Sequence, residues 1–178
     1  MPGRDPAEAT HAFVEVLQRA VSCICNAVFI TSGYHERTEP HAVTLNRGEP
    51  VRLQGHLRLS FSATIHFSHL MVPGQPGPWQ VSLAGYRYAL EATDGRELIS
   101  FHWHPRAPGE INSPHLHLGA AALIGQDALG KAHIPTGIVR LEDVLWLAID
   151  EFAVLPRRID WRDILAETRA AQGMLSVW

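Results

Sequence analysis

LRLSFSATIHF, residues 57–67, alternates apolar and polar side chains without a break. Because successive side chains of a β-strand point to opposite faces, this stretch predicts a strand with one buried face and one polar face. A clean alternation of this kind is typical of antiparallel sheets that expose one face to solvent. The buried row is expected to consist of Leu57, Leu59, Phe61, Ala63, Ile65 and Phe67.

Further strands are predicted on both sides of this stretch. VPGQPGP at 72–78 ends it with three prolines, and Trp79–Leu90 forms the next strand, with a bulge expected at Ala84-Gly85, where the apolar parity changes. The Asp94-Gly95 pair predicts a hairpin turn into a strand over Arg96–His104. Upstream, HAVTLNRGEPVRL at 41–53 predicts two short strands around an Asn46-Arg47-Gly48 turn.

Helices are predicted at both ends of the chain. Apolar residues recur at helical spacing from Pro6, with Asp5 as the N-cap. LEDVLWLAIDEF at 141–152 has one apolar face, and Asp160 is expected to cap a last helix over DWRDILAETRAA. The fold class is therefore α+β, an antiparallel β-meander sheet with an N-terminal helix and two C-terminal helices packed on one face.

The chain of 178 residues has the size of a single domain, 1–178. Within it we distinguish an N-terminal helix with accessory strands (1–55), a central core (56–152) and a C-terminal helix (153–178). A formal net charge of −3 gives no whole-molecule attraction to nucleic acid or membrane. Because no signal peptide or membrane span is recognisable, we expect a cytoplasmic protein with buried thiols at Cys23 and Cys25.

FHWHPRAPGEINSPHLHLG, residues 101–119, contains four of the eleven histidines as two His-x-His pairs. In extended strands, His102 and His104 share one face, and so do His115 and His117. The intervening apolar side chains should face the core. If the loop folds the two strands into a hairpin, the four imidazoles converge on one exposed patch, which is the predicted functional site.

One interpretation of this patch is metal-free acid–base catalysis, typically RNA cleavage, with His102, His104, His115 and His117 as catalytic residues and no cofactor. The pKa of histidine lies near neutral pH, so one imidazole can accept a proton while another donates one. Tyr86, Tyr88 or Trp103 could stack on a base. Cationic or polar side chains could bind the substrate phosphate, and the candidates are Arg96, Arg106, Lys131, His133 and Arg140.

A second interpretation is a metal site for zinc or another transition metal, built by His102, His104, His115 and His117 with Glu110. Neutral imidazole is a good ligand for such ions, and His133 could also complete the shell. This interpretation predicts a hydrolase or an oxygenase. A third is a non-enzymatic module in which the histidine face or the C-terminal helices bind a protein partner. An edge strand would also permit homodimerisation.

Residues 56–152 resemble the TumE-type toxins of bacterial toxin–antitoxin operons in the order of their features. The matching segments are LRLSFSATIHF, YRYAL with its DGREL turn, PHLHLG and LEDVLWLAIDEF. His115, His117 and Gly119 correspond to the family's His-x-His-x-Gly, whereas HWHP stands where these toxins more often have an acidic pair. The resemblance implies a growth-inhibiting toxin neutralised by a helix-turn-helix antitoxin, and the histidine chemistry adds RNA as its substrate.

Overall fold

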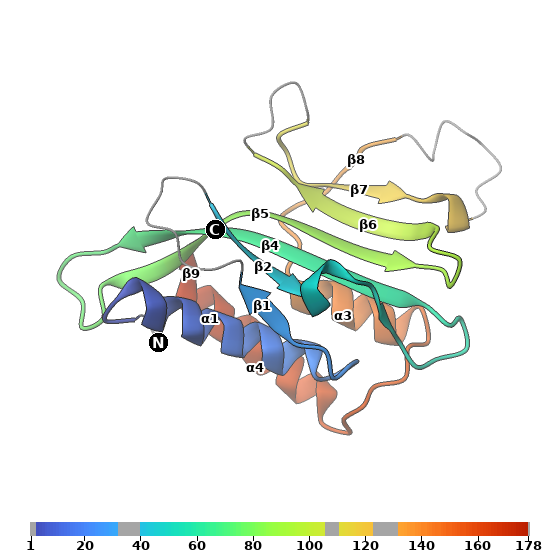
Figure 1. Ribbon diagram of the computed structural model, residues 1–178, viewed down its shortest axis with the longest axis horizontal. Coiled ribbons are helices and arrows are strands. Elements are labelled where there is room, and N and C mark those ends of the chain that lie inside the picture. Colours follow the sequence, from blue (N-terminus) through green and yellow to red (C-terminus); the bar gives the residue numbers. More distant parts are fainter. Residues whose placement is uncertain (1–2, 32–39, 106–110, 123–131, 178) are drawn as a thin grey trace.

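The computed structural model describes residues 3–31, 40–105, 111–122 and 132–177. One antiparallel sheet forms the centre of the molecule, and three helices lie together on one of its sides (Figure 1). The predicted α+β fold, with one N-terminal and two C-terminal helices on one face of the sheet, is confirmed. The other face carries no helix of the described chain.

The helices are α1 (Pro6–Val21), α3 (Leu141–Asp150) and α4 (Trp161–Leu175). The strands are β1 (Phe29–Thr31), β2 (His41–Leu45), β3 (Val51–Arg52), β4 (Ser60–Met71), β5 (Trp79–Glu91), β6 (Glu97–Trp103), β7 (His115–Leu118), β8 (Ile134–Pro135) and β9 (Ser176–Val177). Their order across the sheet is β1-β2-β4-β5-β6-β7-β8, with β3 beside β4 and β9 parallel to β5. The short 3-10 turns η1 (Asn46–Gly48) and η2 (Ala120–Ala122) follow β2 and β7.

The long hairpin of β4 and β5 forms the middle of the sheet. Its register changes where His66 pairs with Gly85 and Phe67 pairs with Leu83, so Ala84 is the extra residue of a bulge. The bulge expected at Ala84-Gly85 is confirmed. Gly85 has a φ of 149°, and a Cβ there would lie 2.7 Å from the Trp103 carbonyl oxygen. Only glycine permits β6 to approach β5 this closely.

The apolar row of β4 packs under the helices as predicted, with Phe61, Ala63, Ile65 and Phe67 all buried in the core. Leu57 is an exception. The strand begins only at Ser60, and the Leu57 side chain is 55% exposed. Residues 57–59 precede the strand, and Arg58 has a positive φ of 50°. The backbone is therefore not extended there, and the Leu57 side chain does not share the buried face of β4. The prediction that Leu57 is buried was wrong.

The helix boundaries follow from local chemistry. Asp5 accepts a hydrogen bond from the Glu8 amide at 2.8 Å, and Pro6 occupies the first turn of α1, as predicted. Helix α4 begins directly after Asp160, but the carboxylate of Asp160 accepts hydrogen bonds from Arg158. Asp160 thus stands at the predicted N-cap position, directly before the first residue of α4.

None of the helices in the described chain has the length and apolar character needed to cross a membrane.

Gly119 directly follows β7, at a point where the chain passes very close to β6. Its amide donates to the Leu98 carbonyl at 3.0 Å, and a Cβ there would lie only 2.0 Å from the Glu97 carbonyl oxygen. Backbone atoms cannot move aside as a flexible side chain can. The glycine is therefore required for the β6–β7 pairing that carries the histidines.

We predict that Gly119→Ala lowers the free energy of unfolding by about 2 kcal/mol or more, since the added methyl group overpacks a backbone contact. Urea denaturation followed by circular dichroism measures this. Gly137→Ala is the matched control, because nothing lies within 4 Å of a Cβ at that position. Equal stability of the two variants would contradict the close approach of β7 to β6.

Candidate metal centre on the open face of the sheet

The pairing of β6 with β7 brings the two His-x-His segments together. His102 lies directly opposite His115, and Ser100 lies opposite His117. The ring centroids are 5.8 Å apart for His102 and His115, 5.0 Å for His102 and His117, and 5.0 Å for His115 and His117. The convergence expected from the sequence is thus present for these three residues, which we call the histidine triad.

Two further imidazoles flank the triad. His133 immediately precedes β8, and its ring centroid lies 4.4 Å from that of His117 and 5.1 Å from that of His115. On the other side, His104 Nε2 lies 3.4 Å from His102 Nδ1. His104 is also close enough to His66 on β4 to help lower the pKa of that residue, after the larger effect of burial. Imidazoles therefore extend across the open face from β4 to β8.

The triad has the arrangement of a metal-binding group. One nitrogen from each of His102, His115 and His117 can be chosen so that all three lie within 4.8 Å of one another. His115 is buried, with 5% of its surface exposed, whereas His102 and His117 are half-buried. The three side chains come from two adjacent strands, so a rigid backbone ladder fixes their spacing.

The electrostatics of the triad favour neutral imidazole. The pKa of His102 is lowered to about 3, mainly by burial and in addition by the positive charges that His117, Arg87, His104 and His115 can carry. Burial also lowers the pKa of His117, followed by the effects of His133 and His115, while Glu97 opposes the shift. Both rings are therefore unprotonated at neutral pH, and an unprotonated nitrogen is what a metal ion requires.

A chain of hydrogen bonds fixes the ring of His102. Arg87 Nη2 donates to Glu97 Oε2 at 2.8 Å, and the Ser100 hydroxyl donates to Glu97 Oε1. Since the hydroxyl hydrogen of Ser100 is used on the carboxylate, its oxygen accepts from His102 Nε2 at 2.9 Å. The hydrogen of neutral His102 therefore lies on Nε2, and Nδ1 carries the lone pair.

His115 is oriented by the backbone. Its Nδ1 lies 2.8 Å from the Ser113 carbonyl oxygen, which can only accept a hydrogen bond. The hydrogen of the neutral ring is therefore on Nδ1, and Nε2 has the lone pair. Outer hydrogen bonds that fix the tautomer in this way are typical of histidines that bind metals.

The other predicted site residues lie elsewhere or outside the described chain. Arg96 pairs with Asp94 in the β5–β6 turn, and Arg140 precedes α3 on the helix side, where it donates to the Arg169 carbonyl. Arg106, Glu110 and Lys131 lie outside the described residues, so their proposed roles stay predictions.

The aromatic residues proposed for base stacking lie on the core side of the sheet. Tyr86 and Tyr88 are buried against each other beneath the sheet, and burial is the main cause that raises the pKa of both. Trp103 packs against the same core, and its Nε1 donates to the Asn112 carbonyl. The two tyrosines are core residues and cannot stack on a ligand at the histidine face.

Sequence reasoning did not identify Arg87, Glu97 and Ser100 as parts of the site. Beyond the Asp94-Gly95 turn, Leu90 pairs with Ile99, and the same register places Arg87 opposite His102. Ser100 lies two residues before His102 and so shares its face. Counting back from the turn would have found both. Glu97 was harder to find because the register shifts between Leu90 and Glu91.

No family model matches the chain, and neither a curated protein nor a solved structure matches it significantly. The resemblance of residues 56–152 to TumE-type toxins therefore stays a prediction.

We predict that Ser100→Ala weakens the preference of neutral His102 for the Nε2–H tautomer by about fivefold, which corresponds to one hydrogen bond of about 1 kcal/mol. Imidazole nitrogen chemical shifts in ¹⁵N-labelled protein report this ratio directly. Ser68→Ala, on β4 outside the network, is the control and should leave His102 unchanged. An unaltered tautomer ratio in Ser100→Ala would contradict the hydrogen-bond chain.

Proposed function

We propose that this protein binds a divalent transition metal ion, zinc in the first place, through His102, His115 and His117. The observation that supports this most directly is the spacing of the three ligand nitrogens, within 4.8 Å of one another. Ligands of a tetrahedral zinc ion with bonds of about 2.0–2.1 Å are separated by about 3.4 Å. The rings would move closer together to reach that spacing around an ion.

Three protein ligands leave one tetrahedral position for water or substrate, which is the pattern of catalytic rather than structural zinc. This position would face solvent, because the open face of the sheet carries no helix of the described chain and His102 and His117 are only half-buried. The function that fits best is therefore metal-dependent hydrolysis. A bound zinc ion would lower the pKa of its water to about 7 and so supply hydroxide at neutral pH.

The chain's own residues would have separate tasks in this reaction. The triad holds the ion, and the carboxylate of Glu97, acting through Ser100, orients the ring of His102. His104 and His133 flank the triad on opposite sides. Either can accept a proton from the bound water or deliver one to a leaving group. His133 is exposed and so lies where a substrate would arrive.

The expectations of a cytoplasmic toxin, a helix-turn-helix antitoxin partner and homodimerisation stay predictions. Metal-free ribonuclease activity requires a different protonation state of the same histidines. It requires one imidazole that is protonated near neutral pH, whereas burial and the neighbouring positive charges lower the pKa of His102 to about 3. His102 is thus better suited to bind a metal than to act as a general acid.

We predict that the purified protein binds about one zinc ion per chain and that His117→Ala weakens this binding by at least about a hundredfold. The loss of a direct ligand should exceed the loss of an outer-shell partner, which weakens metal binding by about 10- to 100-fold. Isothermal titration with zinc chloride measures both the stoichiometry and the affinity. His11→Ala is the control, because that exposed side chain pairs with Glu15 on α1.

Hydrolysis is tested on RNA and on bis(p-nitrophenyl) phosphate with zinc-loaded and chelator-treated protein. Cleavage that depends on zinc and is lost in His117→Ala supports the proposal. RNA cleavage that survives chelation would contradict it and support the metal-free ribonuclease. A protein that binds no transition metal, with circular dichroism confirming that it is folded, would also contradict it.

A further inference from the structure

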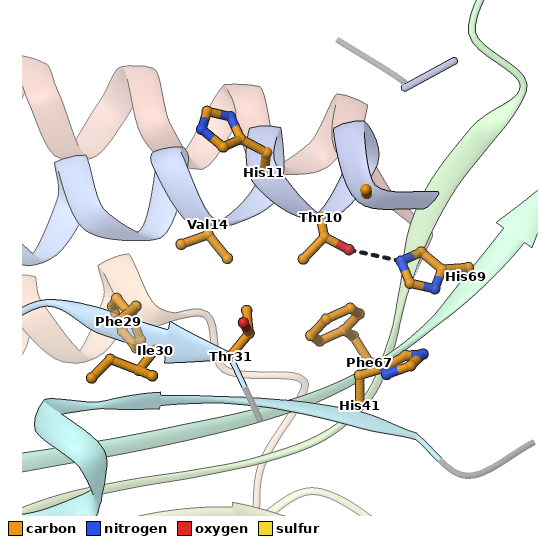
Figure 2. A pocket seen from close by; sticks show the side chains of 10 residues that line it. Thr10, His11, Val14, Phe29, Ile30, Thr31, His41, Phe67 and His69 are labelled. Atoms are coloured by element: carbon orange, nitrogen blue, oxygen red, sulfur yellow. Dashed lines mark hydrogen bonds between the residues drawn. The ribbon is translucent and has the colours of Figure 1, made fainter. Parts of the chain in front are cut away.

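A polar pocket of about 360 Å³ lies at the corner of the sheet formed by β3, the start of β4 and the end of β5. It is lined by Arg52, Leu53, Arg58 and Thr93, and we call it the arginine pocket. These four residues belong to the stretch 40–105, which the structure describes without a gap. The pocket between α1 and the strands β1, β2 and β4 is different, because apolar side chains form most of its wall and its His69 is hydrogen-bonded to Thr10 (Figure 2).

The arginine pocket lies on the open face of the sheet. Val51 and its partner Phe61 both pack in the core under the helices. Arg52 and its partner Ser60 are the next pair, so they point to the opposite face. The histidine triad is on the same face, but β4 and β5 lie between β3 and β6. The pocket therefore shares a face with the metal centre and no residue with it.

The backbone holds Arg58 in a fixed and unusual conformation. Its φ of 50° lies in the left-handed region, which residues other than glycine rarely adopt. The turn around it is closed by a hydrogen bond of 2.8 Å from the Leu53 amide to the Leu59 carbonyl. A second bond of 2.8 Å, from the Leu155 amide to the Gln54 carbonyl, ties this turn to the chain after α3. Backbone strain that is held in place in this way is frequent at binding sites.

The two arginines bring positive charge that no described residue neutralises. Neither guanidinium group of Arg52 or Arg58 forms a hydrogen bond or an ion pair within the described chain, and both side chains are exposed. Two carboxylates of this corner are already engaged, since Asp94 pairs with Arg96 and Glu91 accepts a hydrogen bond from a β4 hydroxyl. Like charges that line one pocket repel each other, and an anion between them would remove this repulsion.

The donors of the arginine pocket suit a phosphate group. A guanidinium group is always charged, and its planar set of N–H donors matches the oxygens of phosphate. The Thr93 hydroxyl can donate a further hydrogen bond. Phosphate groups are mainly dianions above a pH of about 6, so one group can neutralise both arginines, whereas one carboxylate cannot. The volume also falls within the range of about 300–1,000 Å³ that is usual for small-ligand sites.

We propose that the arginine pocket binds a dianionic phosphate group, as inorganic phosphate or as a small phosphate monoester, through the guanidinium groups of Arg52 and Arg58 and the hydroxyl of Thr93. The anchored turn holds the backbone of Arg58 in place before the ligand arrives, so less conformational freedom is lost on binding. This site does not depend on a metal ion at the histidine triad.

Isothermal titration of the full chain at neutral pH, after metal has been removed by dialysis, tests this site with inorganic phosphate, glucose 6-phosphate and acetate. Both phosphate probes should bind saturably at one site per chain, and acetate should bind at least about tenfold more weakly. Equal affinity for the two phosphate probes would identify the phosphate group alone as the ligand. Tighter binding of glucose 6-phosphate would identify a monoester.

Arg52→Gln and Arg58→Gln should each weaken phosphate binding at least about tenfold, because each removes charge-assisted hydrogen bonds. Arg47→Gln is the matched control, since Arg47 is also exposed and has a φ of 59° but lies outside the pocket. Its affinity for phosphate should be unchanged. His117→Ala should also bind phosphate normally, so failure of this site can be distinguished from failure of the metal centre.

Circular dichroism checks that each variant is folded. Absence of saturable phosphate binding to the unaltered protein would overturn the proposal. Equal binding of acetate and phosphate, or an equal loss of affinity in Arg47→Gln and Arg58→Gln, would overturn it as well, because either result would indicate a general attraction of anions to positive charge.

Discussion

The alternation of side chains across β4, β5, β6 and β7 is the constraint on which the rest of the structure depends. Phe61, Tyr88 and Phe101 lie on the face that the helices cover, and each is buried. A shift of one residue in any strand would exchange the two faces. Because the apolar row must be buried, the polar row is held on the opposite face, and the histidines belong to that row.

Strand pairing then turns a row of histidines into a site. His102 and His115 are 13 positions apart in the sequence but directly opposite each other in the sheet, and His133 arrives beside His117 from the approach to β8. Burial at the centre of this group keeps His102 and His117 neutral. Several like-charged imidazolium rings in so small an area would destabilise the sheet, whereas neutral rings can share one cation.

Much of this arrangement could be predicted from the sequence. The alternation of LRLSFSATIHF, the Asp94-Gly95 turn and the parity change at Gly85 identify the strands, the hairpin and the bulge. These signals are local, because each one depends only on the backbone geometry of residues that are neighbours in the sequence. They also predict that the two His-x-His pairs share a face, which the pairing of β6 with β7 confirms for His102 and His115.

The parts that could not be predicted depend on contacts between distant segments. The Glu97–Ser100–His102 chain needs the register on both sides of a bulge, and Leu57 was misplaced because the turn before β4 extends into the start of the alternating stretch. The arginine pocket needs the turn before β4 to lie beside the turn between β5 and β6, which no local pattern specifies. Tyr86 and Tyr88 illustrate the same limit, since an aromatic residue suits a core as well as a binding face.

X-ray absorption spectroscopy of the zinc-loaded protein tests the central claim most directly, because it reads the ligands of the ion itself. The account predicts a four-coordinate ion with three imidazole nitrogens and one oxygen at about 2.0–2.1 Å. The imidazole contribution should fall to two nitrogens in His117→Ala, measured at a zinc concentration that keeps the weakened site occupied. A spectrum without imidazole scattering, or one dominated by sulfur from Cys23 and Cys25, would contradict the account.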